Sequence, residues 1–283
     1  MPTSRPSTGV PTASSAEGCT AAASSRTSVE SLLLRDRLLV GGALIAVTLL
    51  CWAWIVPMAR DMYGTMTGAS AWMMTDTWDL THLALLFAMW AVMMAGMMLP
   101  SAAPALFLYG CVIRGSAERS RAKAHIYAFA GGYLFVWTAY SLLATALQRL
   151  LARWLLISPM MDAQDKRFGG ALLILAGLYQ FTPFKRACLA SCRNPVEFMT
   201  RQWRPGLSGG VYLGAANGLY CLGCCWALMM LLFVGGVMNL WWIAALTVFV
   251  LLEKAAPFGE KGGRYSGLAL IAVGLWSAVR GFS

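Results

Sequence analysis

Long uninterrupted apolar runs constrain the fold of this chain more than any other feature. Several approach or exceed the roughly 20 residues with which a helix crosses a bilayer, and none alternates as a membrane β-strand would. Charged residues make up only 12% of the chain, against about 25% in soluble proteins. The sequence therefore predicts an all-α, polytopic transmembrane bundle with about 6–7 spans. The candidate runs are 38–58, 80–112, 125–147, 168–183, 208–236, 239–256 and 266–281.

Two of these runs have features that suit the interior of a bundle. The run 80–112 is longer than a bilayer needs and contains Pro100 and Pro104, so we expect a kink or break past its first half. The run 168–183 is short, and short or interrupted membrane helices tend to line cavities. The last two runs, which follow Gly235-Gly236, could instead form a re-entrant hairpin.

The positions of Lys and Arg predict the orientation. With a cytoplasmic N-terminus, 16 of the 22 Lys and Arg would face the cytoplasm, as the positive-inside rule requires. They lie in the segments 1–37, 113–124, 184–207 and 253–265. Anionic lipid headgroups are then the natural counter-charge for the net +10, and no nucleic-acid partner is needed to explain it. We expect a multi-pass protein of the bacterial inner membrane.

The first 37 residues differ from the rest of the chain. Ser, Thr, Ala and Pro dominate 1–37, without apolar periodicity before Leu32, so we predict a disordered cytoplasmic tail. The tail has no short apolar segment followed by a cleavage site, which favours an anchor over a signal peptide for the first span. Residues 38–283 are expected to form the transmembrane domain with the metal-binding motifs.

Methionines crowd the second run in a helical pattern. At 3.6 residues per turn, their four-residue steps form a stripe of sulfur about 100° wide. Neutral thioethers are cheap to bury and coordinate Cu(I) well. The alternative is that flexible methionines simply fill gaps in the core. The five candidate metal ligands are Met89, Met93, Met94, Met97 and Met98.

Three cysteines lie close together in the fifth run. Cys221, Cys224 and Cys225 are separated by offsets of three and four, which place them on one helix face. With a third donor from the methionine helix, two of these thiols would suit trigonal Cu(I); the alternative is that they are small buried hydrophobes. Upstream glycines at four-residue spacing should let another helix approach closely. They are Gly206, Gly210, Gly214 and Gly218.

A second pair of cysteines, Cys188 and Cys192, falls in a segment predicted to lie at the cytoplasmic surface. We expect the neighbouring Lys185, Arg186 and Arg193 to lower the pKa of both thiols and favour the metal-binding thiolate. This pair is a candidate site for exchanging metal with the cytoplasm.

A third soft-ligand cluster is predicted outside the membrane. Exposed methionines with acids and a histidine suit copper in an oxidising compartment, where free thiols are lost. His82 is a candidate ligand seven residues before the methionine stripe, and alternatively only caps the second span. The cluster comprises Met58, Met62, Met66, Met73, Met74, Asp76, Asp79 and His82.

Glu253 and Lys254 lie together near a membrane boundary. They are either only an internal ion pair, or Glu253 is a functional candidate as an ionisable residue near a span.

These motifs together resemble those of a bacterial family of predicted metal-binding integral membrane proteins, long listed as a domain of unknown function. The resemblance runs from about residue 75 to 280. It rests on Met89-Trp90 through Pro100-Ser101, Tyr179-Gln180 with Pro183 and Lys185, Cys188/Cys192, Cys221 through Trp226 with Met229, Met238-Asn239, and Glu253-Lys254 with Pro257. One branch of the family is described as a membrane copper chaperone associated with a tyrosinase-like copper oxidase, which implies copper handling here.

The residues and the resemblance together predict a membrane protein that binds Cu(I), for transport or for delivery to a cuproenzyme. Its expected partners are the lipid bilayer and a cuproenzyme or another copper chaperone. No phosphate-binding Gly-x-x-x-x-Gly-Lys-Ser/Thr loop occurs in the sequence, which argues against ATP-driven pumping by this chain. The main alternative is a membrane thiol–disulfide carrier that uses Cys221 and Cys224. A third is a scaffolding subunit whose sulfur serves packing alone.

Overall fold

The computed structural model describes residues 40–62, 64, 79–116, 118–154, 163, 165–256 and 259–280. Helices occupy nearly all of these ranges, and no strand occurs in them, which confirms the all-α prediction. The residues from Leu44 onward form one compact unit, to which the description below applies. The predicted tail, 1–37, lies outside the described residues.

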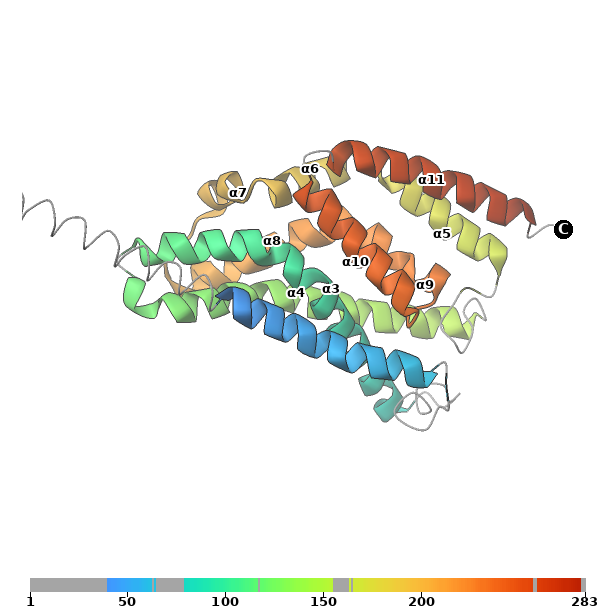
Figure 1. Cartoon of the computed structure of the whole chain (residues 1–283), viewed down its shortest axis with the longest axis horizontal. Helices are drawn as coiled ribbons and strands as arrows, with labels where there is room; N and C mark the ends of the chain where they lie inside the picture. The colour runs from blue at the N-terminus through green and yellow to red at the C-terminus, as the bar shows by residue number, and fades with distance from the viewer. Residues whose placement is uncertain are drawn as a thin grey trace, which may run out of the picture. The chain divides into compact units, whose positions relative to one another are not determined.

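Figure 1 shows how the helices are arranged. Their bounds are Val40–Met62, α3 Leu80–Arg114, the 3-10 turn η1 Arg119–Arg121, α4 Ala122–Arg153, α5 Lys166–Tyr179, α6 Pro183–Arg193, α7 Pro195–Gln202, α8 Gly206–Met230, α9 Leu232–Gly235, α10 Leu240–Ala255 and α11 Gly259–Arg280.

Four helices are long and apolar enough to cross a bilayer: Val40–Met62, Leu80–Arg114, Arg119–Arg153 and Gly206–Gly235. The candidate runs at 168–183 and 239–256 form the shorter helices α5 and α10, of 14 and 16 residues.

Helix α3 continues through both of its prolines. Pro100 and Pro104 lie inside a helix of 35 residues, so the expected break does not occur. The helix nevertheless changes direction along its length (Figure 1), as expected where proline removes backbone hydrogen bonds.

Local capping explains where the elements around the site begin. Asp79 accepts a hydrogen bond from the backbone nitrogen of His82 at the start of α3. Thr182 caps α6, whose first residue is Pro183, and Asn239 caps α10. Each is a residue type that satisfies the unpaired N–H groups of a first helical turn.

Close packing of α4 against α8 forms the centre of the unit. Gly132 of α4 and Gly214 of α8 lie so near the opposite backbone that a Cβ would collide with the carbonyl oxygens of Val211 and Phe129, respectively. The predicted close approach of a helix to the α8 glycines is therefore confirmed for Gly214, and Gly218 packs against Val136 in the same interface. Gly206 has open space beside it and a φ of +79°. It therefore does not contact a neighbouring helix but provides the backbone conformation with which α8 begins.

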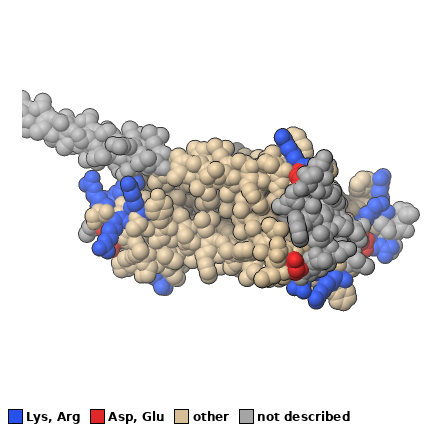
Figure 2. All heavy atoms as spheres, turned by 90° about the horizontal axis from the view of Figure 1, so that it is seen from below, with Lys and Arg blue, Asp and Glu red and all other residues tan. Residues whose placement is uncertain are grey.

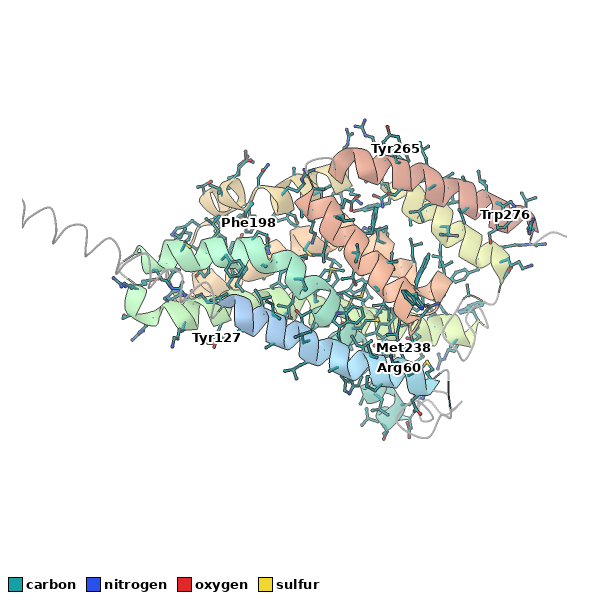
Figure 3. All side chains as sticks on the ribbon, in the orientation of Figure 1. Arg60, Tyr127, Phe198, Met238, Tyr265 and Trp276 are labelled. Carbon is teal, nitrogen blue, oxygen red and sulfur yellow. The ribbon has the colours of Figure 1, made fainter. Side chains whose placement is uncertain are left out.

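The outward surface carries many large apolar side chains. Phe135 and Leu143 of α4 are 71% and 65% exposed, and Tyr265 and Trp276 of α11 point away from the helices beneath them (Figure 3). On the face in Figure 2, charged side chains gather towards the two ends and leave an uncharged middle. Exposed apolar surface of this extent marks a membrane or protein interface.

Candidate functional site

The Cys221 sulfur lies at the centre of a polar cluster inside the helical core. Lys254 of α10 donates a hydrogen bond to it, with an Nζ–Sγ distance of 2.8 Å. The Tyr133 hydroxyl of α4 lies 3.1 Å from the same sulfur and donates to the Met98 carbonyl of α3 at 2.9 Å. Ser101, also on α3, accepts a second hydrogen bond from Lys254 at 2.9 Å. Four helices therefore converge on one thiol.

The other two thiols of α8 are buried beside it. The Sγ atoms of Cys224 and Cys225 donate to the Cys221 carbonyl oxygen at 3.1 and 3.0 Å. All three cysteines are at most 2% exposed. The prediction that they share one helix face is thus confirmed, and that face points into the core.

The pair on α6 joins the same cluster. Cys188 is buried, and its sulfur packs so closely on Gly223 of α8 that a Cβ there would lie 2.7 Å from it. Cys192 is half-buried and packs against the core that contains Cys224. The expected surface position is therefore wrong for Cys188.

The predicted pKa shift for these two thiols is also wrong. Burial raises the pKa of Cys188. The pKa of Cys192 is raised by its hydrogen bond with Cys224 and by burial. The sequence argument failed because the basic neighbours do not offset burial: Lys185 is turned inward to a carboxylate, and the Arg193 guanidinium donates to the Ala256 carbonyl.

The methionine stripe of α3 is buried throughout. Tyr133 links its end to the thiols, because this hydroxyl touches both the Met98 carbonyl and Cys221. Met58, Met62, Met229 and Met238 belong to the same core. The stripe residues are all at most 1% exposed; they are Met89, Met93, Met94, Met97 and Met98.

Only part of the predicted outer cluster falls within the described residues. Met58, Met62 and His82 are buried, so none of the three forms an exposed collecting surface. Asp79 caps α3, which is the role that the alternative interpretation gave to His82. Met66, Met73, Met74 and Asp76 lie outside the described residues.

Glu253 and Lys254 point to different partners. Glu253 pairs with Lys185 of α6, at 2.6 and 2.8 Å from Nζ to its two oxygens, and Lys185 also donates to Gln180. The first alternative is therefore met in another form: Glu253 belongs to an internal ion pair, but its partner is Lys185 of α6 and not Lys254. The sequence did not indicate Lys254 as a site residue, because its charge was counted with those of the predicted cytoplasmic segment 253–265. The available signal was its position inside the apolar run 239–256.

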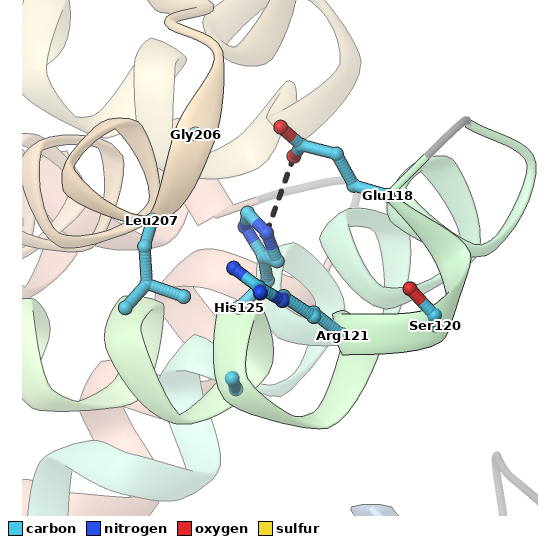
Figure 4. A pocket seen from close by; sticks show the side chains of 7 residues that line it. Glu118, Ser120, Arg121, His125, Gly206 and Leu207 are labelled. Atoms are coloured by element: carbon cyan, nitrogen blue, oxygen red, sulfur yellow. Dashed lines mark ion pairs between the residues drawn. The ribbon is translucent and has the colours of Figure 1, made fainter.

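A surface pocket of about 470 Å³ opens where α4 and α8 begin. His125 lies 3.2 Å from the Glu118 carboxylate (Figure 4) and 3.4 Å from the Tyr109 hydroxyl. This pocket is separate from the thiol cluster, and no sequence motif pointed to it.

The donors in the thiol cluster are soft. Thiols and thioethers favour Cu(I) and related ions over hard cations, and the carboxylate next to Lys254 in the sequence, Glu253, is already paired with Lys185. Within the described ranges, no three His, Cys, Asp or Glu side chains are prearranged to hold a metal. The site is thus a thiol–lysine cluster in the core of an all-helical protein, which would have to rearrange to take up a metal.

The comparisons with known proteins identify the family. Residues 87–277 match the model of the PpoB2 family, described as copper chaperone, and the chain belongs to that family. The match includes α4, α6, α8 and α10, which carry the thiol–lysine cluster. No curated protein and no solved structure matched the chain.

Proposed function

We propose that this protein is a membrane-embedded chaperone that binds Cu(I) at the thiol–lysine cluster and delivers it to a cuproenzyme. The observation that carries the proposal is the convergence of cysteines from two helices beside a methionine-lined core. Cys221, Cys224 and Cys225 come from α8, and Cys192 reaches Cys224 from α6. Copper is the cargo here, in keeping with the copper chaperone family.

The donor set is suited to holding and releasing Cu(I). Thiolates bind this ion tightly, whereas thioethers bind it weakly and carry no charge. The helix that carries the buried stripe meets the cluster at Met98, whose backbone carbonyl and the Cys221 sulfur both contact the Tyr133 hydroxyl. We propose that the stripe offers weak successive sites, since an ion held too tightly along a route would not leave.

The membrane location is part of the proposal. Apolar side chains cover the outward faces of α4 and α8, and four helices have the length to span. We propose about 6–7 spans in the inner membrane, with α5, α10 and α11 completing the bundle and the N-terminus in the cytoplasm. Two of the 16 charges counted as cytoplasmic lie inside the protein in this arrangement: Lys185 bonds to Glu253, and Lys254 bonds to Cys221.

Anaerobic Cu(I) titration of the purified full chain tests the function. Wild type should bind Cu(I), and a variant with Cys221, Cys224 and Cys225 all changed to Ser should lose the tight site. Cys111→Ser, on α3 and outside the cluster, is the matched control and should bind as wild type. Changing Met89, Met93 and Met97 to Leu conserves volume and should slow transfer to an acceptor while leaving the tight site. Unchanged binding in the triple Ser variant would refute the thiol site.

One observation supports a thiol–disulfide carrier as a second candidate function. Cys192 of α6 packs against the core that holds Cys224 of α8, and the two thiols interact, so they form a candidate exchange pair between helices beside the predicted Cys221 and Cys224. Thiol trapping in cells decides between the functions. A Cys192–Cys224 disulfide that turns over with growth conditions would favour the carrier, and its absence would favour copper.

A further inference from the structure

The first helix, Val40–Met62, brings a further set of sulfur side chains to the methionine stripe. Cys51, Met58 and Met62 follow one another at steps of seven and four residues, which place them on one face of this helix. Met58 and Met62 are buried and belong to the same core as the stripe. Cys51 is a half-buried free thiol that packs against that core. The side of the first helix that faces the core therefore carries soft donors.

Gly96 of α3 is the point at which this face meets the stripe. A Cβ at Gly96 would lie 2.9 Å from the Cβ of Cys51 and 3.6 Å from the Cδ1 of Ile55, so the two helices touch here. They run in opposite directions (Figure 1). Met58, seven residues after Cys51, is then level with Met89, seven residues before Gly96. The sulfur side chains of the two helices are thus placed opposite one another.

Two methionines of the stripe lie on either side of this contact along α3. Met93 is about one turn before Gly96 and Met97 directly follows it, and both are buried. The thiol of Cys51 therefore comes to the stripe between two thioethers. One thiol and two thioethers make a three-donor set of the soft kind that Cu(I) prefers.

We propose that Cys51, Met93 and Met97 form a second soft-metal site, which binds Cu(I) within the methionine stripe and separately from the thiol–lysine cluster. The inference rests on the proposed function and deepens it, because it gives a row of weak thioethers one stronger ligand. On binding, Cu(I) bonds to the three sulfurs and the thiol proton of Cys51 leaves to solvent, so one positive charge enters and one leaves. The family match begins at residue 87, so the helix that supplies Cys51 lies outside the matched region.

The site depends on the absence of a side chain at Gly96. Gly96→Ala removes no sulfur, but its Cβ would displace Cys51 from the stripe. This variant should therefore bind Cu(I) more weakly at the second site and leave the thiol–lysine cluster as in wild type. Gly131→Ala is the matched control, because a Cβ at Gly131 meets nothing within 4 Å, and it should leave both sites unchanged.

Anaerobic Cu(I) titration of the purified full chain against a competing chelator tests the site directly. The triple Ser variant of the thiol–lysine cluster should keep a weaker Cu(I) equivalent, and adding Cys51→Ser should abolish that equivalent. Adding Met93→Leu, which conserves volume, should weaken it. Adding Cys111→Ser removes another half-buried cysteine and should leave it unchanged. Equal residual binding with and without Cys51→Ser would refute the second site.

The same question can be put to a chain with an intact cluster, should the triple Ser variant not fold as judged by size exclusion in detergent. Cys51→Ser alone should lower the total Cu(I) bound by one equivalent and leave the affinity of the tight site unchanged. An unchanged total would refute the second site.

The outcomes separate this inference from the proposed function. If wild type binds no Cu(I), both fail. If the triple Ser variant loses the tight site but Cys51→Ser changes neither the residual binding nor the total, only the second site is refuted. If the triple Ser variant keeps the tight site, the proposed function fails, whereas a Cu(I) equivalent that is lost with Cys51→Ser still supports the second site.

Discussion

Glu253 and Lys254 are neighbours in the sequence but bond to residues on different helices. Successive residues of a helix point about 100° apart, so Glu253 reaches α6 while Lys254 reaches α8 and α3. Sequence adjacency suggested one pair, whereas the helical geometry produces two separate partnerships. Lys185 and Glu253 are both nearly inaccessible to solvent, which makes their pairing a condition for burying either charge.

Removing the Glu253 charge should therefore destabilise the protein strongly. Glu253→Gln leaves the buried Lys185 ammonium without a carboxylate, and breaking a buried pair in this way costs about 3–5 kcal/mol. We expect a clearly lower thermal unfolding midpoint in detergent. Glu197→Gln is the matched control, because its partner Arg201 is exposed and exposed pairs contribute at most about 1 kcal/mol. Equal midpoints for both variants would show that the buried pair is unimportant.

At the scale of helices, the glycines of α8 could be predicted to pack closely, but their partner could not. Four-residue spacing marks a face without side chains, which is a local property of the sequence. That Gly214 meets Phe129 and Gly132 meets Val211 depends on contacts between distant segments. Likewise, the spacing of the cysteines was enough to predict that they share one face of α8. It could not predict that α6 and α10 pack against that face.

Two adjacent glycines of α4 provide a matched test of this interface. Gly132→Ala places a Cβ against the Val211 carbonyl and should force α4 and α8 apart, whereas Gly131→Ala meets nothing within 4 Å. We expect Gly132→Ala to lower the unfolding midpoint and the yield of folded protein. Gly131→Ala should be neutral or stabilise by about 0.5–1 kcal/mol, because alanine is the better helix former. Similar midpoints for the two variants would contradict the close packing.

For the whole molecule, composition was sufficient to predict the helical class. Periodicity placed the methionines of α3 and the cysteines of α8 each on one helix face, but Met58, Met62 and Cys188 were expected at a surface and are buried. What the sequence could not supply was which buried groups meet. Lys185 and Lys254 were counted with the loop charges, yet one pairs with Glu253 and the other contacts Cys221. Charges inside a helical core are indistinguishable from loop charges until the helices that enclose them are placed, because their partners lie 68 and 33 residues away along the chain.

The apolar outer surface leads to a prediction about the whole molecule. Phe135 lies in the middle part of α4 and Leu150 near its end, and both are exposed. If this surface faces lipid, Phe135→Lys places a charge deep in the bilayer at a cost of about 2.5–3.5 kcal/mol, whereas Leu150→Lys can extend its amine to the headgroups. The fraction of chain that resists alkaline extraction from membranes should therefore fall for Phe135→Lys and stay high for Leu150→Lys. If both variants behave as wild type, or if the chain is extracted without detergent, the surface does not face lipid and covers a protein partner instead.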